Sequence, residues 1–141
     1  MIKKLLETDR SSGTIFIRIM IGTVFLSEGI QKFLFPAAVG AGRFSKIGLP
    51  SPETWATAVG TTEIICGALV LMGLLSRLAT VPLIAIMLSA LTLTKVEILA
   101  EQGIWKMFHE SRTDWAMLLG NIFLLIKGAG RWSFDRALSN S

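Results

Sequence analysis

Three ionisable side chains lie in an apolar stretch that is long enough to cross a membrane. The run from Ile15 to Phe35 has 21 residues and contains Arg18, Glu28 and Lys32. A helix over this run would be roughly 30 Å long, which matches the hydrocarbon core of a bilayer. Each charge at the bilayer centre costs about 2.5 kcal/mol or more, so each needs a partner. Glu28 and Lys32 are four residues apart and therefore share one face of the predicted helix.

Polar groups also interrupt two other apolar segments of the chain, at Glu63 and Asn121. Counted from the predicted helix ends at about 1.5 Å per residue, both lie at nearly the same depth as Glu28. We therefore predict a polar layer of Glu28, Lys32, Glu63 and Asn121 in the outer half of the membrane. Such a layer could bind a quinone or another lipid-soluble polar ligand and move protons. The alternative is that these groups only hold the helices together.

The composition favours an integral membrane protein of one domain, residues 1–141. Hydrophobic residues make up 52% of the chain and charged residues 17%, with no boundary-like linker. The basic residues are scattered rather than interleaved with aromatic residues, so no nucleic-acid partner is expected. With one cysteine, Cys66, and one histidine, His109, we predict neither a disulfide nor a metal site. We expect no covalently bound cofactor.

The pattern of apolar segments predicts an all-α, up-and-down bundle of four membrane helices. The predicted spans are residues 15–35, 54–75, 78–95 and 112–127. Residues 36–53 are rich in glycine, proline and alanine and predict a loop. Residues 95–113 mix charged and large apolar side chains, and we expect them to form an amphipathic segment on the membrane surface.

The distribution of basic residues predicts the orientation of the four spans. Seven lie on the side that holds both termini: Lys3, Lys4, Arg10, Arg77, Lys127, Arg131 and Arg136. Five lie on the other side: Arg43, Lys46, Lys95, Lys106 and Arg112. Because cytoplasmic loops carry the excess of lysine and arginine, we expect both termini in the cytoplasm and the protein in a cell membrane, most simply a bacterial inner membrane.

Three sequence blocks resemble the DoxX-like family of small membrane proteins. The first block holds Arg18, Gly22, Phe25, Leu26, Gly29, Lys32 and Phe33, and the second holds Glu63, Gly67, Gly73 and Arg77. The third, Gly128 to Arg136, includes Arg131, Trp132 and Asp135 and is similar to the family's Gly-Pro-Gly-Arg-Trp-Ser-Leu-Asp ending, with Ala129 in the place of proline.

The resemblance implies a four-helix membrane bundle linked to membrane redox complexes. The family is named for its likeness to a subunit of an archaeal thiosulfate:quinone oxidoreductase, and some members carry cysteine pairs that this chain lacks. Three functions stay open: a redox subunit that touches quinone, a non-enzymatic scaffold for a soluble or membrane partner, and a small transporter or lipid-binding protein. A homo-oligomer is compatible with each of them.

The chain order also predicts where the third block lies. In an up-and-down bundle, the residues after the fourth helix lie beside the turn between the second and third helices. We therefore expect Arg131, Trp132 and Asp135 near this turn. Trp132 would lie at the membrane boundary, and Asp135 would pair with Arg77 or Arg131.

Overall fold

The computed structural model describes residues 1–141, and every regular element in it is a helix. The long helices are α2 (Thr14–Leu34), α5 (Pro52–Met72), α6 (Ser76–Ala90) and α9 (Arg112–Lys127). Short helices flank them: α1 (Ile2–Leu6), α3 (Pro36–Val39), α4 (Ala41–Ile47), α7 (Val96–Gln102), α8 (Ile104–Glu110) and α10 (Phe134–Ser139). The all-helical class predicted from the sequence is confirmed.

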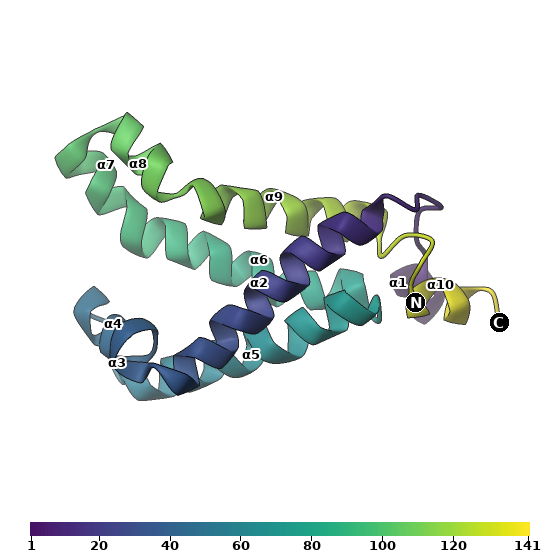
Figure 1. Ribbon diagram of the computed structural model, residues 1–141, viewed down its shortest axis with the longest axis horizontal. Coiled ribbons are helices and arrows are strands. Elements are labelled where there is room, and N and C mark those ends of the chain that lie inside the picture. The colour runs from purple at the N-terminus through teal and green to yellow at the C-terminus, as the bar shows by residue number, and fades with distance from the viewer.

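The four long helices pack as two antiparallel pairs, α2 with α5 and α6 with α9. Both termini, α1 and α10 lie at one end of the molecule, which we call the terminal end (Figure 1). The pairs meet near this end and diverge toward the far end, where α3, α4, α7 and α8 lie. The buried core between the pairs is apolar and contains Ile21, Phe25, Val70, Leu83 and Leu124.

Three helical segments are long and apolar enough to cross a bilayer. They are Thr14–Leu34 and Pro52–Met72, with 21 residues each, and the continuous run Ser76–Gln102, with 27 residues. Helix α9 packs along α6 but has 16 residues, or about 24 Å at 1.5 Å per residue. The structure therefore supports a membrane protein with several apolar helices, in which α9 is the short member.

The segment 95–113 does not form a separate surface helix as predicted. The α6 helix continues through a π-helical turn, η1 (Leu91–Lys95), into α7, because residues 96–102 contain no helix breaker. The chain reverses at Gly103, whose φ of +84° is readily adopted only by glycine. Helix α8 then leads back into α9 through Ser111. The segment is thus the tip of a helical hairpin that extends α6 and α9.

An ion pair joins the two arms of this hairpin below its tip. Lys95 Nζ lies 3.4 Å from Asp114 Oδ2, and both side chains are largely buried. Lys106 and Glu110 form a second pair along α8, at 2.8 Å. Three of the charges that suggested a surface segment from the sequence, Lys95, Lys106 and Glu110, are therefore paired within the hairpin, whereas Glu97, Glu101 and Arg112 form no ion pair.

Candidate functional site

A buried ion pair between Lys32 of α2 and Glu63 of α5 is the central polar feature of the bundle. Lys32 Nζ lies 2.7 Å from Glu63 Oε2, and the two side chains are 9% and 3% exposed. The pair lies one turn from the far end of α2, so both charges are within a segment long enough to span a bilayer. Each charge compensates the other where water is scarce, which is the condition for keeping such groups in a membrane helix.

Four glycines bring α2 and α5 close enough for this pair to form. Gly22 faces Gly67, and Gly29 faces Gly60, so each helix contributes one glycine every seven residues. A Cβ atom on Gly29 would lie 2.7 Å from the Gly60 carbonyl oxygen, and one on Gly67 would lie 2.9 Å from the nitrogen of Leu26. These glycines, Gly22 and Gly29 among them, therefore allow the backbones of α2 and α5 to approach closely.

The other two residues of the predicted polar layer are not part of this ion pair. Glu28 is exposed, and it is two turns from Ile21 on the same face of α2. Ile21 contacts Gly120 of α9, so this face of α2 is the one that turns toward α9. Glu28 therefore lies on the side where the two helix pairs diverge, rather than buried between α2 and α5.

Asn121 occupies a different level of the bundle. Its neighbour Gly120 packs against Ile21, seven residues before Glu28, which is roughly 10 Å along the helix axis. Asn121 is fully buried and its amide nitrogen donates to the Met117 carbonyl at 2.8 Å within its own helix. The layer expected from helix ends is thus split, because α9 is shorter than α2 and its residues lie nearer the terminal end.

Arg18 is a buried anchor at the terminal end rather than a residue that reaches toward water. It is 4% exposed, and its guanidinium donates to the Val70 and Leu71 carbonyls at 3.0 and 2.6 Å. These carbonyls belong to the last turn of α5, and that of Val70 also accepts from the Gly73 N–H at 3.1 Å. Arg18 also donates to the carbonyls of Ala129 at 3.4 Å and of Trp132. One side chain therefore connects α2, the end of α5 and the C-terminal segment.

Asp135 lies beside the turn between α5 and α6, as predicted, but its partners differ from those predicted. Its carboxylate accepts hydrogen bonds from the backbone N–H groups of Leu75 and Ser76 at 2.6 and 3.0 Å, so it caps the start of α6. The predicted pairing of Asp135 with Arg77 or Arg131 is wrong. Two free N–H groups and the positive end of the α6 dipole hold the carboxylate instead.

The protonation of Asp135 reflects two opposed effects. Complete burial of its side chain raises the pKa above the ordinary value of 3.8. The hydrogen bonds from Ser76 and Leu75 and the positive charge of Arg18 lower the pKa, but they offset only part of the effect of burial. Asp135 is thus a carboxyl group that holds its proton more tightly in the folded protein than in water.

The remaining residues of the family motif also lie at the terminal end. Arg77 donates to the carbonyls of Glu7 at 3.0 Å and Leu125 at 3.1 Å, which ties α6 to α9 and to the N-terminal segment. Gly73 has a φ of +69° and lies against Arg18 and Ser133. Trp132 is 65% exposed, in keeping with the predicted boundary position, and Arg131 is also exposed.

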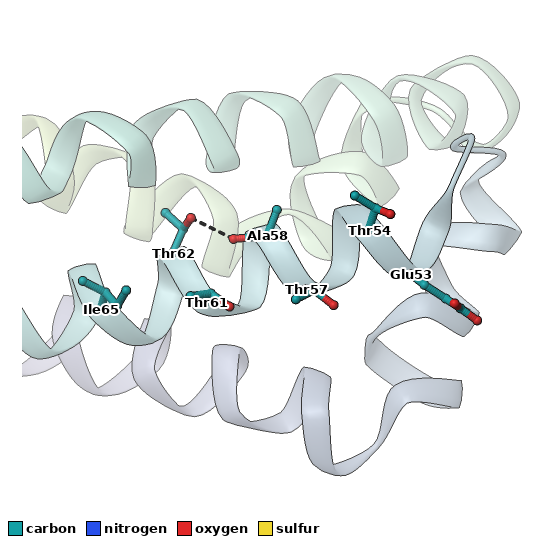
Figure 2. A pocket seen from close by; sticks show the side chains of 7 residues that line it. All are labelled: Glu53, Thr54, Thr57, Ala58, Thr61, Thr62 and Ile65. Carbon is teal, nitrogen blue, oxygen red and sulfur yellow. Dashed lines mark hydrogen bonds between the residues drawn. The ribbon is translucent and has the colours of Figure 1, made fainter.

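A groove of about 660 Å³ runs along the far half of α5 and is rich in threonine. Figure 2 shows that all of its lining residues come from this helix: Glu53, Thr54, Thr57, Ala58, Thr61, Thr62 and Ile65. Most of them lie on a different face of α5 from Gly60, Glu63 and Gly67, which face α2. We did not predict this groove from the sequence, although the threonines at 54, 57 and 61 recur at helical spacing.

Thr57 and Thr61 of this groove differ from other threonines of the helices, including Thr62 of the same groove, in how their hydroxyls are bonded. Thr23 and Thr92 donate their hydroxyls to carbonyls one turn earlier, and Thr62 does the same to Ala58 at 2.8 Å. The hydroxyls of Thr57 and Thr61 have no hydrogen-bond partner in the protein, although both residues are exposed. In a bilayer, a free hydroxyl favours a polar partner over lipid chains.

The fold and the buried pair define an α-helical membrane protein with several apolar helices. A family model described as DoxX matches residues 13–96, and the chain belongs to this family. It is also 50% identical over 142 aligned residues to a protein of Mycobacterium tuberculosis described as uncharacterized membrane protein Rv3486, in an alignment that covers 96% of this chain and 87% of that protein. No solved structure matches the chain.

Proposed function

We propose that this protein is a membrane subunit of a redox-associated complex and that the Lys32–Glu63 pair holds a lipid-soluble polar ligand such as a quinone. The observation that carries the proposal is a buried acid–base pair at 2.7 Å inside an apolar helix bundle. The redox part of the proposal is supported by the resemblance of the motif residues to the family. A helix bundle of this kind carries no electrons itself, so the redox centre would belong to the ligand or to a partner.

The chemistry of the pair suits a ligand with carbonyl oxygens. A lysine ammonium can donate up to three hydrogen bonds, so it can serve Glu63 and a ligand oxygen together. A carboxylate in a low-dielectric site can also take or give the proton that accompanies quinone reduction. Glu28 lies one turn from Lys32 on the exposed side of α2, where it can exchange protons with the surface.

The test is binding of a quinone analogue to purified wild-type protein and to Glu63→Gln, each shown to be folded by its melting curve. We expect binding by the wild type and at least roughly tenfold weaker binding by the variant, since a charged hydrogen-bond partner contributes about 1.5 kcal/mol or more. Glu101→Gln, which removes an exposed acid at the hairpin tip, is the matched control and should bind as the wild type does.

The double variant Lys32→Met/Glu63→Gln separates binding from folding. It leaves no buried charge without a partner, so it should fold even where Glu63→Gln is unstable. Absence of binding by the wild type, or equal affinity in the wild type and the folded variants, would leave the pair with a structural role only.

The threonine groove supports a second candidate, a scaffold that packs against a transmembrane helix of a partner subunit or of another copy. Small side chains allow close helix approach, and free hydroxyls can donate across the contact. In this case Thr57→Leu/Thr61→Leu should reduce the amount of partner that is isolated with the protein from its native membrane. Thr23→Leu is the matched control, because Thr23 is exposed but its hydroxyl is bonded within α2.

The topology that accompanies both candidates has four spans, with both termini in the cytoplasm. The supporting observation is a count that leaves aside Arg18, Glu28, Lys32 and Glu63 inside the helices: the terminal end holds seven basic and three acidic residues, whereas the far end holds five of each. Positive charge favours the cytoplasmic side of the membrane.

A further inference from the structure

Three arginines from separate segments converge at the terminal end of the molecule. Arg10 precedes α2, Arg131 follows α9, and Arg136 belongs to α10. Together with Asn140 they line a hollow of about 530 Å³ that has no apolar side chain in its wall. We call this hollow the arginine pocket.

Backbone hydrogen bonds fix the segments that carry these arginines. The Arg131 N–H donates to the Ser11 carbonyl at 3.1 Å, next to Arg10. The Thr8 hydroxyl donates to the Gly130 carbonyl at 3.3 Å, which joins the same two segments a second time. The Asp135 N–H donates to the Gly73 carbonyl at 2.8 Å and so anchors the helix that carries Arg136. The pocket is therefore part of the folded structure and not a chance meeting of loose side chains.

The positive charges of the pocket are not compensated by the protein. None of the three guanidinium groups makes a hydrogen bond or an ion pair with another residue. The neighbouring acids are engaged elsewhere: Asp9 accepts from the Ser11 N–H and lies 3.8 Å from Lys127, and Asp135 caps α6. Three like charges around one hollow repel each other, so the arrangement is stabilised by an anion between them.

We propose that the arginine pocket binds the phosphate of an anionic phospholipid. Arginine forms paired hydrogen bonds with phosphate oxygens, and several arginines can serve one headgroup. Arg10 lies four residues before α2 begins and Arg131 four residues after α9 ends, which is the level of lipid headgroups for helices that span the bilayer. Trp132 and Phe134, 65% and 58% exposed, lie in the chain between Arg131 and Arg136 and are aromatic side chains of the kind that favours this interface. A soluble phosphate shares the chemistry but gives no reason for these aromatic residues.

The test is native mass spectrometry of the full-length protein in a neutral detergent, with equal amounts of dioleoylphosphatidylglycerol and dioleoylphosphatidylcholine. The wild type should retain phosphatidylglycerol in preference to phosphatidylcholine. The variant Arg10→Gln/Arg131→Gln/Arg136→Gln should bind phosphatidylglycerol on the order of 100-fold more weakly, given about a fivefold contribution from each basic residue. The control Arg43→Gln/Lys46→Gln/Arg112→Gln removes three exposed basic residues from the far end and should retain the preference.

Two further measurements complete the test. One distinguishes a loss of lipid binding from a loss of folding, and the other distinguishes a lipid ligand from a soluble phosphate. If the triple variant does not fold, the single variants Arg10→Gln and Arg131→Gln should each lower the affinity roughly fivefold. Displacement of phosphatidylglycerol by millimolar inorganic phosphate would assign the pocket to a soluble phosphate and overturn the lipid assignment. Equal retention of the two lipids by the wild type, or an unchanged affinity in the folded arginine variants, would overturn the proposal as a whole.

Discussion

At the scale of single residues, Arg18 shows how a charge can be buried in a membrane helix without a carboxylate partner. Its guanidinium donates to several carbonyls at the end of α5 and in the C-terminal segment. From the sequence we expected only that each charge in this apolar run needs a partner. A carbonyl-capping role is hard to predict, because backbone acceptors leave no mark in the sequence.

We predict that Arg18→Ala lowers the free energy of unfolding by on the order of 3 kcal/mol or more, since a charged donor that serves several buried carbonyls is lost. Arg18→Lys should recover only part of the loss, because an ammonium does not present the planar fork of donors. The measurement is thermal or denaturant unfolding in detergent. If both variants were as stable as the wild type, the guanidinium contacts would contribute nothing to the fold.

Asp135 leads to a prediction about pH. Its pKa is raised in the folded protein, so the folded state binds the proton more tightly than the unfolded chain does. The stability that comes from this proton is present below about pH 4 and is lost as the pH rises through the folded pKa. We therefore expect the melting temperature of the wild type, relative to that of Asp135→Ala, to fall as the pH is raised from about 4 to about 7.

The same variant should be less stable than the wild type at every pH in this range. Removal of the carboxyl group leaves the N–H groups of Leu75 and Ser76 without acceptors, at a cost of about 2 kcal/mol. If the melting temperatures of the wild type and of Asp135→Ala changed in parallel with pH, the pKa of Asp135 would be the same in the folded and unfolded states.

At the scale of elements, the α2–α5 contact depends on the glycines that face each other. We predict that Gly29→Ala destabilises the protein by about 1–3 kcal/mol, because the new methyl group would lie 2.7 Å from the Gly60 carbonyl oxygen and force the helices apart. Gly13→Ala is a matched control, since a Cβ at Gly13 meets only the Ser11 hydroxyl at 3.6 Å, and its effect should stay within about 0.5 kcal/mol. Equal melting temperatures for the two variants would contradict the close contact.

The four long helices were the most predictable elements, for local reasons, whereas residues 36–53, predicted as a loop, contain the short helices α3 and α4. Apolar runs and turn residues such as Pro36, Ser51 and Gly73 mark the helix ends directly in the sequence. The hairpin over residues 91–111 was not predicted, because charged residues suggested a surface helix while the decisive feature was the positive φ of Gly103. The common level of Glu63 and Lys32 along the bundle was predicted from the sequence, but the level of Asn121 was not. The level of Asn121 depends on how α9 is placed along α2, which spacing within one helix does not determine.

At the scale of the whole molecule, the two ends differ in charge and in construction. The terminal end is held by the buried side chains of Arg18 and Asp135 and by Arg77, and it carries the arginine pocket. The far end carries the Lys32–Glu63 pair and the α5 groove, where the two helix pairs diverge (Figure 1). A rigid end on one side of the membrane and an open end on the other suit a protein that receives a ligand or a partner helix from the bilayer.

The orientation of these ends in the membrane gives the last prediction. In a Cys66→Ala background, we expect Ser45→Cys and Gln102→Cys to react with a membrane-impermeant thiol reagent added outside the cell. Ser141→Cys should react only after the membrane is made permeable. The reason is the excess of basic residues at the terminal end, which favours the cytoplasm. Each of the three native side chains is exposed, so a lack of labelling cannot come from burial in the fold.

This experiment also tests whether α9 crosses the bilayer. Gln102 precedes α9 and Ser141 follows it, so labels at the two positions lie on opposite sides only if this helix of 16 residues spans. A span of about 24 Å requires local thinning of the bilayer, and the basic side chains at its ends, Arg112 and Lys127, can reach the headgroups. Reaction of both cysteines from the same side would reduce the protein to three spans, and reaction of Ser141→Cys alone from outside would reverse the orientation.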